Sequence, residues 1–537
     1  MIYKIYLENL HIKSFILTGS LLLYLHLGNV LYAQTFNEID KIVASDRFDN
    51  ASFGNACDIY QTTAIVGAQS ESKDSNGQNQ LLGAGAAYIF ENINSGICSE
   101  TQKIVASDRS EFSNFGESVS IDEDYAIVGA YRDDFDESGS NAILNAGSAY
   151  LFKRNSSGGW EQQQKIVASN RAENSEFGVI VSISGSQVIV GSSSGSAYIF
   201  EKNASNIWTE TANLINPDET GAGFGDYVDI WGNCVVIGSP NADLDANGQN
   251  PISSAGAAFI YDKNASGNWE LTQKIDGLHR DAEDRFGYSV AIDNNFIVVG
   301  AFADDEDENG GNPINAAGSA FIFEKNSNGI WQRVQKIVAS NRGLEDTFGG
   351  RVSISGNIAI VSSLTSMIDP VTSQVLLKGG GSVYVFSRNG NGVWNEEQEL
   401  MASDREPYDF FSISSSIYGN TIIVGALDED EDCLGNNTLN NSGSSYLYSD
   451  PTLGNEINTK IDKIVAFPNP AKTNVFLSGV FKGVNTTFSI FDIQGKLLNS
   501  ETIEQNKINT SDLAAGIYFI TIRNDYQSQT IKLLIEN

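Results

Sequence analysis

Residues 115–168 read FGESVSIDEDYAIVGAYRDDFDESGSNAILNAGSAYLFKRNSSGGWEQQQKIVA. This stretch holds four short runs of β-branched and aromatic residues, which Gly, Asn, Asp and Ser separate. Such runs between turn-forming residues predict strands, here at Ser118–Ile121, Tyr125–Gly129, Ser148–Phe152 and Gln163–Ala168. Several runs are apolar at nearly every position, which is typical of strands covered on both faces.

The same unit recurs along the chain. A Phe-Gly pair opens each copy, and the Phe residues are Phe53, Phe115, Phe177, Phe224, Phe286 and Phe348, with a degenerate seventh copy at Phe411. Successive Phe positions differ by 62, 62, 47, 62, 62 and 63 residues. Five copies also place a Trp at one fixed position, at Trp160, Trp208, Trp269, Trp331 and Trp394. Self-similarity at a fixed period indicates a repeat architecture, here of seven units.

Seven four-stranded units predict an all-β fold, a seven-bladed β-propeller over residues 34–449. A solenoid of stacked repeats is the alternative geometry. The run that begins at Lys41 matches the fourth strand of later repeats, whereas the seventh repeat stops after Ser445–Tyr448 without a fourth strand. We therefore expect the N-terminal strand to complete blade 7 and close the ring, which removes exposed sheet edges.

The repeats resemble the FG-GAP family of integrin α-subunit propellers and bacterial surface proteins. The matching residues are the Phe-Gly pairs, the following Val128-Gly129-Ala130 and the strand Gly147-Ser148-Ala149-Tyr150. The resemblance implies a propeller with a binding or adhesion role, and it identifies no ligand, because function depends on particular sites rather than on a fold.

Acidic loops between the second and third strands of several repeats are candidate calcium sites. The residues are Asp243, Asp245 and Asn247 in the fourth repeat, Asp305, Asp307 and Asn309 in the fifth, and Asp134, Asp136 and Ser138 in the second. Calcium needs six to eight hard oxygens, which alternating carboxylates with a following Gly supply. The loops resemble integrin calcium loops but have Asn for the third Asp and Pro251 or Pro313 for the last. The alternative is a solvated acidic turn.

The recurring Arg residues of the Lys-Ile-Val-Ala-Ser runs and the phased Trp residues have structural and functional interpretations. We expect each Arg to pair with a nearby Asp, a bond of modest energy. The Trp residues could form a sugar-stacking array, but Trp at a fixed repeat position more often packs against a blade.

Both ends of the chain predict export. Residues 1–33 contain an apolar run that ends in Ala33, which is typical of a secretory signal peptide. After a polar linker at 450–462, residues 463–537 predict a small antiparallel β-sandwich. Phe467-Pro468-Asn469-Pro470 and Leu513-Ala514-Ala515-Gly516 within it resemble the type A sorting domain of the type IX secretion system. That resemblance implies the secretion machinery as a partner and an outer-surface or released protein. An ordinary terminal β-domain used in binding is the alternative.

Composition narrows the function. A formal net charge of −34 argues against nucleic acid or an anionic membrane as partner. His279 is the one histidine beyond the predicted signal segment. A Ser-His or Cys-His catalytic site therefore has a single candidate for its general base. We expect no enzyme and no membrane span in the mature protein, but a surface propeller that binds a protein or glycan ligand and is stabilised by calcium. One alternative is a carboxylate-based polysaccharide hydrolase or lyase, and another is a passive surface-layer component with no specific ligand. Of the four cysteines, Cys57 and Cys98 are candidates for a disulfide.

Overall fold

The computed structural model describes residues 35–93, 99–218, 222–365, 379–450 and 465–536, the last range with gaps at 468, 470, 473, 479–486, 493–495, 503–506, 512 and 524–527. The predicted signal peptide (1–33), most of the predicted linker and Cys98 lie outside these residues, so the Cys57–Cys98 disulfide stays a prediction. Within the described ranges every regular element is a strand. The same ranges contain no helix with the length and apolar character that crossing a membrane requires.

The first four repeats form one four-stranded antiparallel sheet each. Blade 1 holds β2 (Phe53–Tyr60), β3 (Thr63–Ala68), β4 (Ala86–Glu91) and β5 (Ser99–Ile104). Blade 2 holds β6 (Val119–Asp122), β7 (Tyr125–Ala130), β8 (Ser148–Arg154) and β9 (Trp160–Ile166). Blade 3 holds β10 (Val181–Ser184), β11 (Gln187–Ser192), β12 (Ser196–Lys202) and β13 (Trp208–Ile215). Blade 4 holds β14 (Val228–Trp231), β15 (Cys234–Ser239), β16 (Ala257–Lys263) and β17 (Trp269–Ile275).

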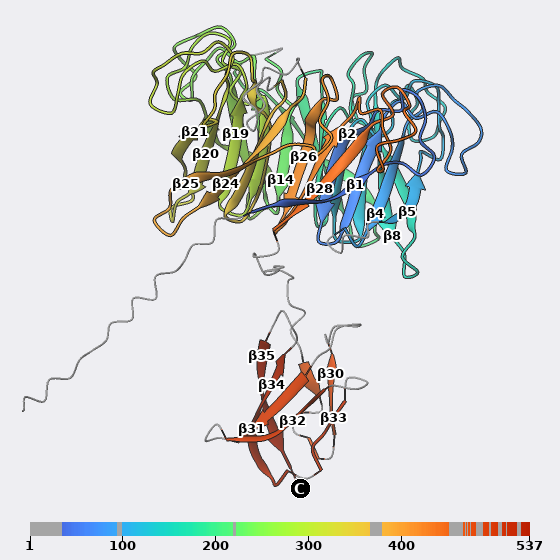
Figure 1. Ribbon diagram of the computed structural model, residues 1–537, viewed down its shortest axis with the longest axis vertical. Coiled ribbons are helices and arrows are strands. Elements are labelled where there is room, and N and C mark those ends of the chain that lie inside the picture. The colour runs from blue at the N-terminus through green and yellow to red at the C-terminus, as the bar shows by residue number, and fades with distance from the viewer. Residues whose placement is uncertain are drawn as a thin grey trace, which may run out of the picture. The chain divides into compact units, whose positions relative to one another are not determined.

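The remaining repeats follow the same plan, and the N-terminal strand joins the last one. Blade 5 holds β18 (Ser289–Asp293), β19 (Phe296–Ala301), β20 (Ser319–Lys325) and β21 (Trp331–Ile337). Blade 6 holds β22 (Phe348–Ser355), β23 (Ile358–Ser363), β24 (Ser382–Arg388) and β25 (Trp394–Leu400). Blade 7 holds β26 (Phe411–Tyr418), β27 (Thr421–Ala426), β28 (Ser444–Ser449) and β1 (Asn37–Ile42), which pairs antiparallel with β28 (Figure 1).

The blades close into a ring, which the contacts between innermost strands show. Each innermost strand contacts the innermost strand of the next blade, from β2 through β6, β10, β14, β18, β22 and β26 back to β2. The apolar cores lie between neighbouring blades. One such core combines Ile65 and Ile89 of blade 1 with Phe115, Val128 and Trp160 of blade 2. The all-β propeller predicted from the repeats is confirmed.

The Phe-Gly motif owes its spacing to packing inside and between blades. Phe115 is fully buried, and its ring centroid lies 5.4 Å from that of Tyr150 on the third strand of its own blade. Gly147 precedes that third strand with φ +81° and forms a bridge to Phe177 of the next blade. A Cβ on Gly147 would lie 2.1 Å from the Phe177 carbonyl oxygen. Only glycine fits this position, because it combines a left-handed conformation with close backbone approach.

The outermost strand lies earlier in the sequence than expected. In the second repeat it spans Trp160–Ile166, not Gln163–Ala168, and β1 likewise ends at Ile42. The Trp160 backbone bonds to the Gln102 side chain of blade 1 through both its N–H and its carbonyl, at 2.7 Å each, which starts the strand there. After Ile166 the chain leaves the sheet and carries Arg171 back to the acidic loop.

Residues 465–536 form two antiparallel sheets over one core. One sheet contains β29 (Val465–Phe467), β30 (Asn474–Ser478) and β33 (Lys507–Asn509). The other contains β31 (Thr487–Phe491), β32 (Leu497–Thr502), β34 (Gly516–Arg523) and β35 (Ser528–Ile535). Val475 and Ile508 of the first sheet are buried in one cluster with Phe488, Ile520 and Leu533 of the second. The segment is therefore a small β-sandwich.

Candidate functional site

The second acidic residue of each predicted calcium loop accepts hydrogen bonds from its own loop. Asp245 Oδ1 accepts the backbone N–H groups of Asn247 and Gln249 at 2.9 Å each, and Asp245 Oδ2 accepts the side-chain amide of Asn250 at 2.7 Å. Asp307 and Asp136 have the same pattern, as do Asp74 and Asp432, whose loops match the calcium pattern less well. These donors, the Asn250 amide first, lower the pKa of Asp245.

The first acidic residue of each loop pins the loop at a second point. Asp243 Oδ1 accepts the backbone N–H of Ser254 at 2.8 Å, and Asp305 and Asp134 accept the equivalent N–H groups of Ala316 and Asn145 at 2.7 Å. The third predicted ligands, Asn247, Asn309 and Ser138, are exposed.

An arginine clamps each loop through its backbone rather than its carboxylates. Arg280 Nη2 donates to the Asp243 carbonyl at 2.6 Å, and Nη1 donates to the Asn250 carbonyl at 3.1 Å. Arg342 and Arg171 hold the fifth and second loops in the same way. The predicted Arg–Asp pairing is therefore structural, as expected, but the acceptor is the main chain, because the carboxylates are already occupied by N–H donors.

The loop geometry fits calcium only in part. Asn250 and Asn312 turn an N–H, not an oxygen, towards Asp245 and Asp307, so the side chains as they lie do not form an all-oxygen cage. Calcium binding by Asp243, Asp245, Asn247, Asp305, Asp307, Asn309, Asp134, Asp136 and Ser138 stays a prediction.

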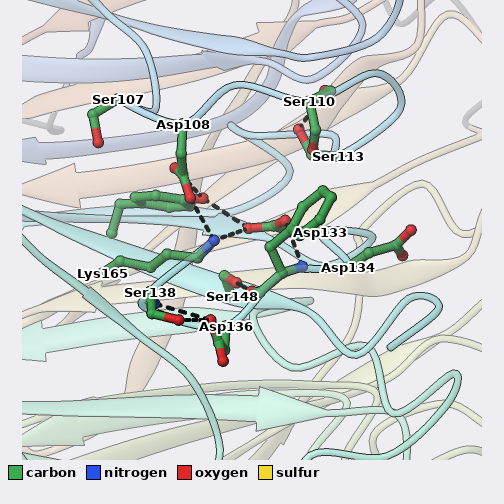
Figure 2. A network of polar contacts seen from close by, with 12 residues as sticks. Ser107, Asp108, Ser110, Ser113, Asp133, Asp134, Asp136, Ser138, Ser148 and Lys165 are labelled. Carbon is green, nitrogen blue, oxygen red and sulfur yellow. Dashed lines mark hydrogen bonds and ion pairs between the residues drawn. The ribbon is translucent and has the colours of Figure 1, made fainter. Parts of the chain in front are cut away.

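A second set of charges joins neighbouring blades behind these loops. Lys165 Nζ lies 2.7 Å from a carboxylate oxygen of Asp108 and 2.7 Å from one of Asp133, and Figure 2 shows it between the two. The Tyr150 hydroxyl donates to the same carboxylates at 2.9 and 2.7 Å. Asp108 follows the outermost strand of blade 1, whereas the other three residues belong to blade 2. The cluster therefore links the two blades.

The fifth repeat departs from this pattern and gathers acids. Among the described residues, the acidic side chains of Asp284, Asp304 and Glu306 come within metal-ligand distance of one another. Burial raises the pKa of both Asp284 and Glu306 to about 7, and the neighbouring carboxylates add to the effect. Lys336 lies 2.8 Å from Asp304, and Glu306 Oε2 is buried without a hydrogen-bond partner. These residues lie beside Asp305 and Asp307, but sequence analysis did not single them out as ligands.

A cavity of about 740 Å³ occupies one end of the propeller axis. All seven blades line it with residues near the start of the innermost strand, for example Asn55, Glu117, Tyr288 and Arg351. The loops between second and third strands emerge at this same end, because the innermost and second strands are antiparallel. The acidic loops therefore surround the face on which the cavity lies.

The cavity is where the repeats differ in chemistry. The position two residues after each Phe-Gly pair is Arg351 in blade 6, and the other blades have Ala56, Ser118, Ile180, Tyr227, Ser289 and Ser414. The Arg351 guanidinium carbon lies 5.6 Å from the centroid of the Tyr227 ring. Tyr227 lies 4.7 Å from Tyr288, and Tyr288 lies 4.2 Å from Phe302, all between ring centroids. A cationic group thus stands beside an aromatic wall.

Two carboxylates complete the lining. Burial raises the pKa of Glu117 to about 7 although Arg351 and Arg132 act to lower it. Burial raises the pKa of Asp226 to about 6, and Glu176 adds to the increase. Glu176 perturbs both residues, whereas neither Glu117 nor Asp226 perturbs the other.

The phased tryptophans pack, as expected. Trp160, Trp208, Trp331 and Trp394 are buried between blades, while Trp269 is partly exposed and donates its indole N–H to Glu201 at 3.0 Å. A sugar-stacking Trp array does not fit such burial.

Comparison with protein families matches the FG-GAP repeat model at residues 36–90, 98–152, 160–200, 269–323, 331–386 and 394–448. The model of a secretion system C-terminal sorting domain matches residues 465–536. Residues 201–268, which hold β13 and the first three strands of blade 4, fall outside the FG-GAP matches, yet blade 4 forms the same four-stranded sheet as the others. No curated protein matches the chain.

Three solved structures resemble the chain, each with a TM-score of 0.43. A protein from Lactobacillus plantarum has 9% identity and covers 83% of this chain and 98% of its own. U3-55K has 12% identity and covers 77% of this chain and 100% of its own. The WD40 repeats of RRP9 have 13% identity and cover 77% of this chain and 99% of their own.

Proposed function

Because the chain belongs to the FG-GAP repeat family and ends in a secretion-system sorting domain, we propose that it is a ligand-binding propeller of the outer cell surface. The sorting domain indicates secretion. Its ligand is a protein or a glycan, and the propeller holds this ligand without transforming it.

The observation that supports binding is the axial cavity. Concave sites with a few convergent polar groups are where proteins most often hold ligands. This cavity is assembled at the end of the axis where all seven repeats meet and where their side chains differ.

The test screens the purified mature protein, labelled with a fluorophore, against glycan and protein arrays. We expect a retained ligand whose signal falls in Tyr288→Ala and persists in Trp231→Ala, which alters an exposed residue away from the cavity. An unchanged signal in Tyr288→Ala, or release of degraded ligand over time, would overturn the assignment. Surface labelling of cells that express the chain without residues 463–537 tests location, and continued surface display would contradict it.

We also propose that calcium stabilises the propeller near the fifth acidic loop. Two ligand sets are available there: the predicted Asp305 and Asp307, and the converging Asp284, Asp304 and Glu306. Calcium brings two positive charges, which would offset both the burial that chiefly raises the pKa of Asp284 and Glu306 and the repulsion between carboxylates that adds to it. A cation that binds only the folded protein raises the unfolding midpoint.

Thermal unfolding of the full chain, with calcium and with chelator, distinguishes these sets. A calcium-dependent rise that Asp305→Asn with Asp307→Asn abolishes assigns the predicted loop. A rise that survives this change but is lost in Asp284→Asn with Glu306→Gln assigns the converging acids. If the unfolding midpoint does not rise at millimolar calcium, both ligand assignments are wrong.

A further inference from the structure

The half-buried guanidinium of Arg351 lines the axial cavity, and no carboxylate of the described residues forms an ion pair with it. It donates a hydrogen bond from Nη1 to the Gly350 carbonyl at 2.9 Å, lies against the ring of Tyr227, and hydrogen-bonds with the hydroxyls of Tyr227 and Tyr288, all of which are neutral partners. Glu117 lies near enough for Arg351 to affect its pKa. Glu117 nevertheless keeps a raised pKa, whereas a carboxylate in a close ion pair with arginine has a lowered one. Arg351 therefore has capacity for another anion.

An uncompensated arginine is unusual in a chain with a net charge of −34. Charged side chains inside proteins are almost always paired. The guanidinium fork matches a carboxylate, with which it forms two parallel hydrogen bonds. The missing partner is thus expected to be an anionic group on a ligand.

The aromatic wall beside Arg351 suits a sugar ring. Tyr227, Tyr288 and Phe302 form a continuous series of ring contacts. The C–H face of a pyranose is apolar and packs against aromatic rings, while the hydroxyls of Tyr227 and Tyr288 hydrogen-bond with Arg351 and hold it beside the wall. Glu117, Asp226 and Asn241 supply further acceptors for the hydroxyl groups of a sugar.

The size and rim of the cavity are compatible with part of a chain polymer. A volume of about 740 Å³ lies within the usual range for small-ligand sites. Blade 3 joins its second and third strands by Ser193–Gly195 only, whereas the equivalent connection in blade 2 spans 131–147. Ser193 and Gly195 themselves line the cavity. The rim is therefore lowest at blade 3, between Glu117 of blade 2 and Asp226 of blade 4, which leaves an entrance for a longer glycan.

We propose that the axial cavity binds a carboxylate-bearing saccharide, with the sugar carboxylate on Arg351 and the ring against Tyr227 and Tyr288. This inference rests on the proposed binding function and specifies its ligand class. The carboxylate comes from a uronic acid or from a sialic acid, since both present the same group on a pyranose ring.

The test is isothermal titration calorimetry with the mature full chain. The probes are a trigalacturonate, its neutral galactose counterpart and a sialylated lactose, so that the sugars differ mainly in the carboxylate and its source. We expect binding of at least one acidic probe and binding of the neutral probe that is about tenfold or more weaker. Arg351→Met should lower the affinity for the acidic probe to that for the neutral probe. Arg351→Lys should have an intermediate effect, because lysine keeps the positive charge but not the forked pair of donors.

Arg333→Met is the matched control, because it removes an arginine from the outer strand β21 and should leave affinity unchanged. If Arg351→Met does not fold, Tyr288→Ala provides a second test, and it should lower the affinity for all the sugars. Equal affinity for acidic and neutral probes, or acidic binding that survives in Arg351→Met, overturns the inference. If the arrays instead reveal a neutral glycan or an acidic protein at this cavity, the saccharide class is wrong and the binding function stands. If folded protein retains no ligand on any array, the binding function fails as well.

Discussion

Replacement of Lys165 by Met should destabilise the propeller through the charges that it leaves behind. The Lys165 side chain is 5% exposed and lies between Asp108 and Asp133, whose side chains are 35% and 2% exposed. Without the ammonium group, two carboxylates share the Tyr150 hydroxyl as their remaining common donor. Removal of one partner from a buried ion pair costs about 3–5 kcal/mol, because the other charge stays buried without compensation.

The size of the effect on the melting temperature follows from the size of the propeller. With an unfolding entropy of about 2.1 cal/mol/K per residue over about 400 residues, a loss of 3–5 kcal/mol lowers Tm by about 4 to 6 °C. Because Asp108 is partly exposed, water screens part of the penalty, and we expect the lower end of that range. Differential scanning calorimetry of the mature chain at pH 7 measures this shift.

Two further variants test the explanation. Gln163→Met changes an exposed residue on the same strand and should leave Tm within about 1 °C. Combining Lys165→Met with Asp108→Asn and Asp133→Asn removes the uncompensated charges and should recover part of the loss. The reasoning is refuted if Lys165→Met leaves Tm unchanged, or if the added Asn substitutions lower it further.

Three other perturbations have expected outcomes. Gly147→Ala should lower Tm by several degrees, because the new Cβ would meet the backbone of Phe177, whereas Gly139→Ala, with a similar φ but open space around it, should cost far less in the same scan. Arg342→Lys should expose the fifth loop to limited proteolysis, since lysine cannot donate to two carbonyls as the fork does; an unchanged cleavage pattern would contradict the clamp. Glu117 has a folded pKa of about 7 against an ordinary value of 4.5, so its contribution to stability is present below pH 4.5 and is lost as the pH rises through 7. Glu117→Gln should therefore raise Tm at pH 8 but not at pH 4.5, and an equal shift at both would rule out the titration.

The blades and their number could be predicted because every repeat carries the same markers in phase. Phe115 and Gly147 illustrate why: one packs on its own blade and the other approaches the next blade, so both positions are fixed in each repeat. The pairing of β1 with β28 corresponds to the missing fourth strand of the seventh repeat. Repeat geometry is thus encoded locally and is visible in one chain.

The roles of the acidic loops were harder to predict, because one pattern serves two purposes. Alternating Asp residues before a Gly suit a calcium loop, but they also suit a turn in which a carboxylate accepts backbone N–H groups. Asp245 and Asp307 do the latter in this structure. The orientation of the Asn250 and Asn312 side chains distinguishes a calcium loop from a hydrogen-bonded turn, and the sequence does not specify that orientation.

The axial cavity was not predicted, because each repeat contributes only a few of its residues and these groups lie dozens of positions apart in the sequence. A signal was available in the position two after each Phe-Gly pair, where Arg351 and Tyr227 replace small residues. Comparison of the repeats for their differences, rather than their shared residues, would have found it.

The repeats also reveal how their buried charges are balanced. Blades 1, 2 and 7 place two carboxylates around the lysine and carry Tyr88, Tyr150 and Tyr446 beside it. Blades 4 and 5 pair the lysine with one carboxylate and have Phe259 and Phe321 at the tyrosine position. In these five blades the hydroxyl is thus present where a second carboxylate needs a donor, whereas Tyr198 of blade 3 and Tyr384 of blade 6 donate to the Asn170 and Asn341 side chains.

The pairing of β1 with β28 links completeness of the chain to its delivery. The ring closes only with residues 444–449, and the sorting domain begins shortly after them, at 465. Any product of interrupted synthesis, or of proteolysis from the C-terminal side, that lacks β28 also lacks the sorting domain. Loss of the strand that closes the ring from the C-terminal side therefore always removes the segment that indicates secretion.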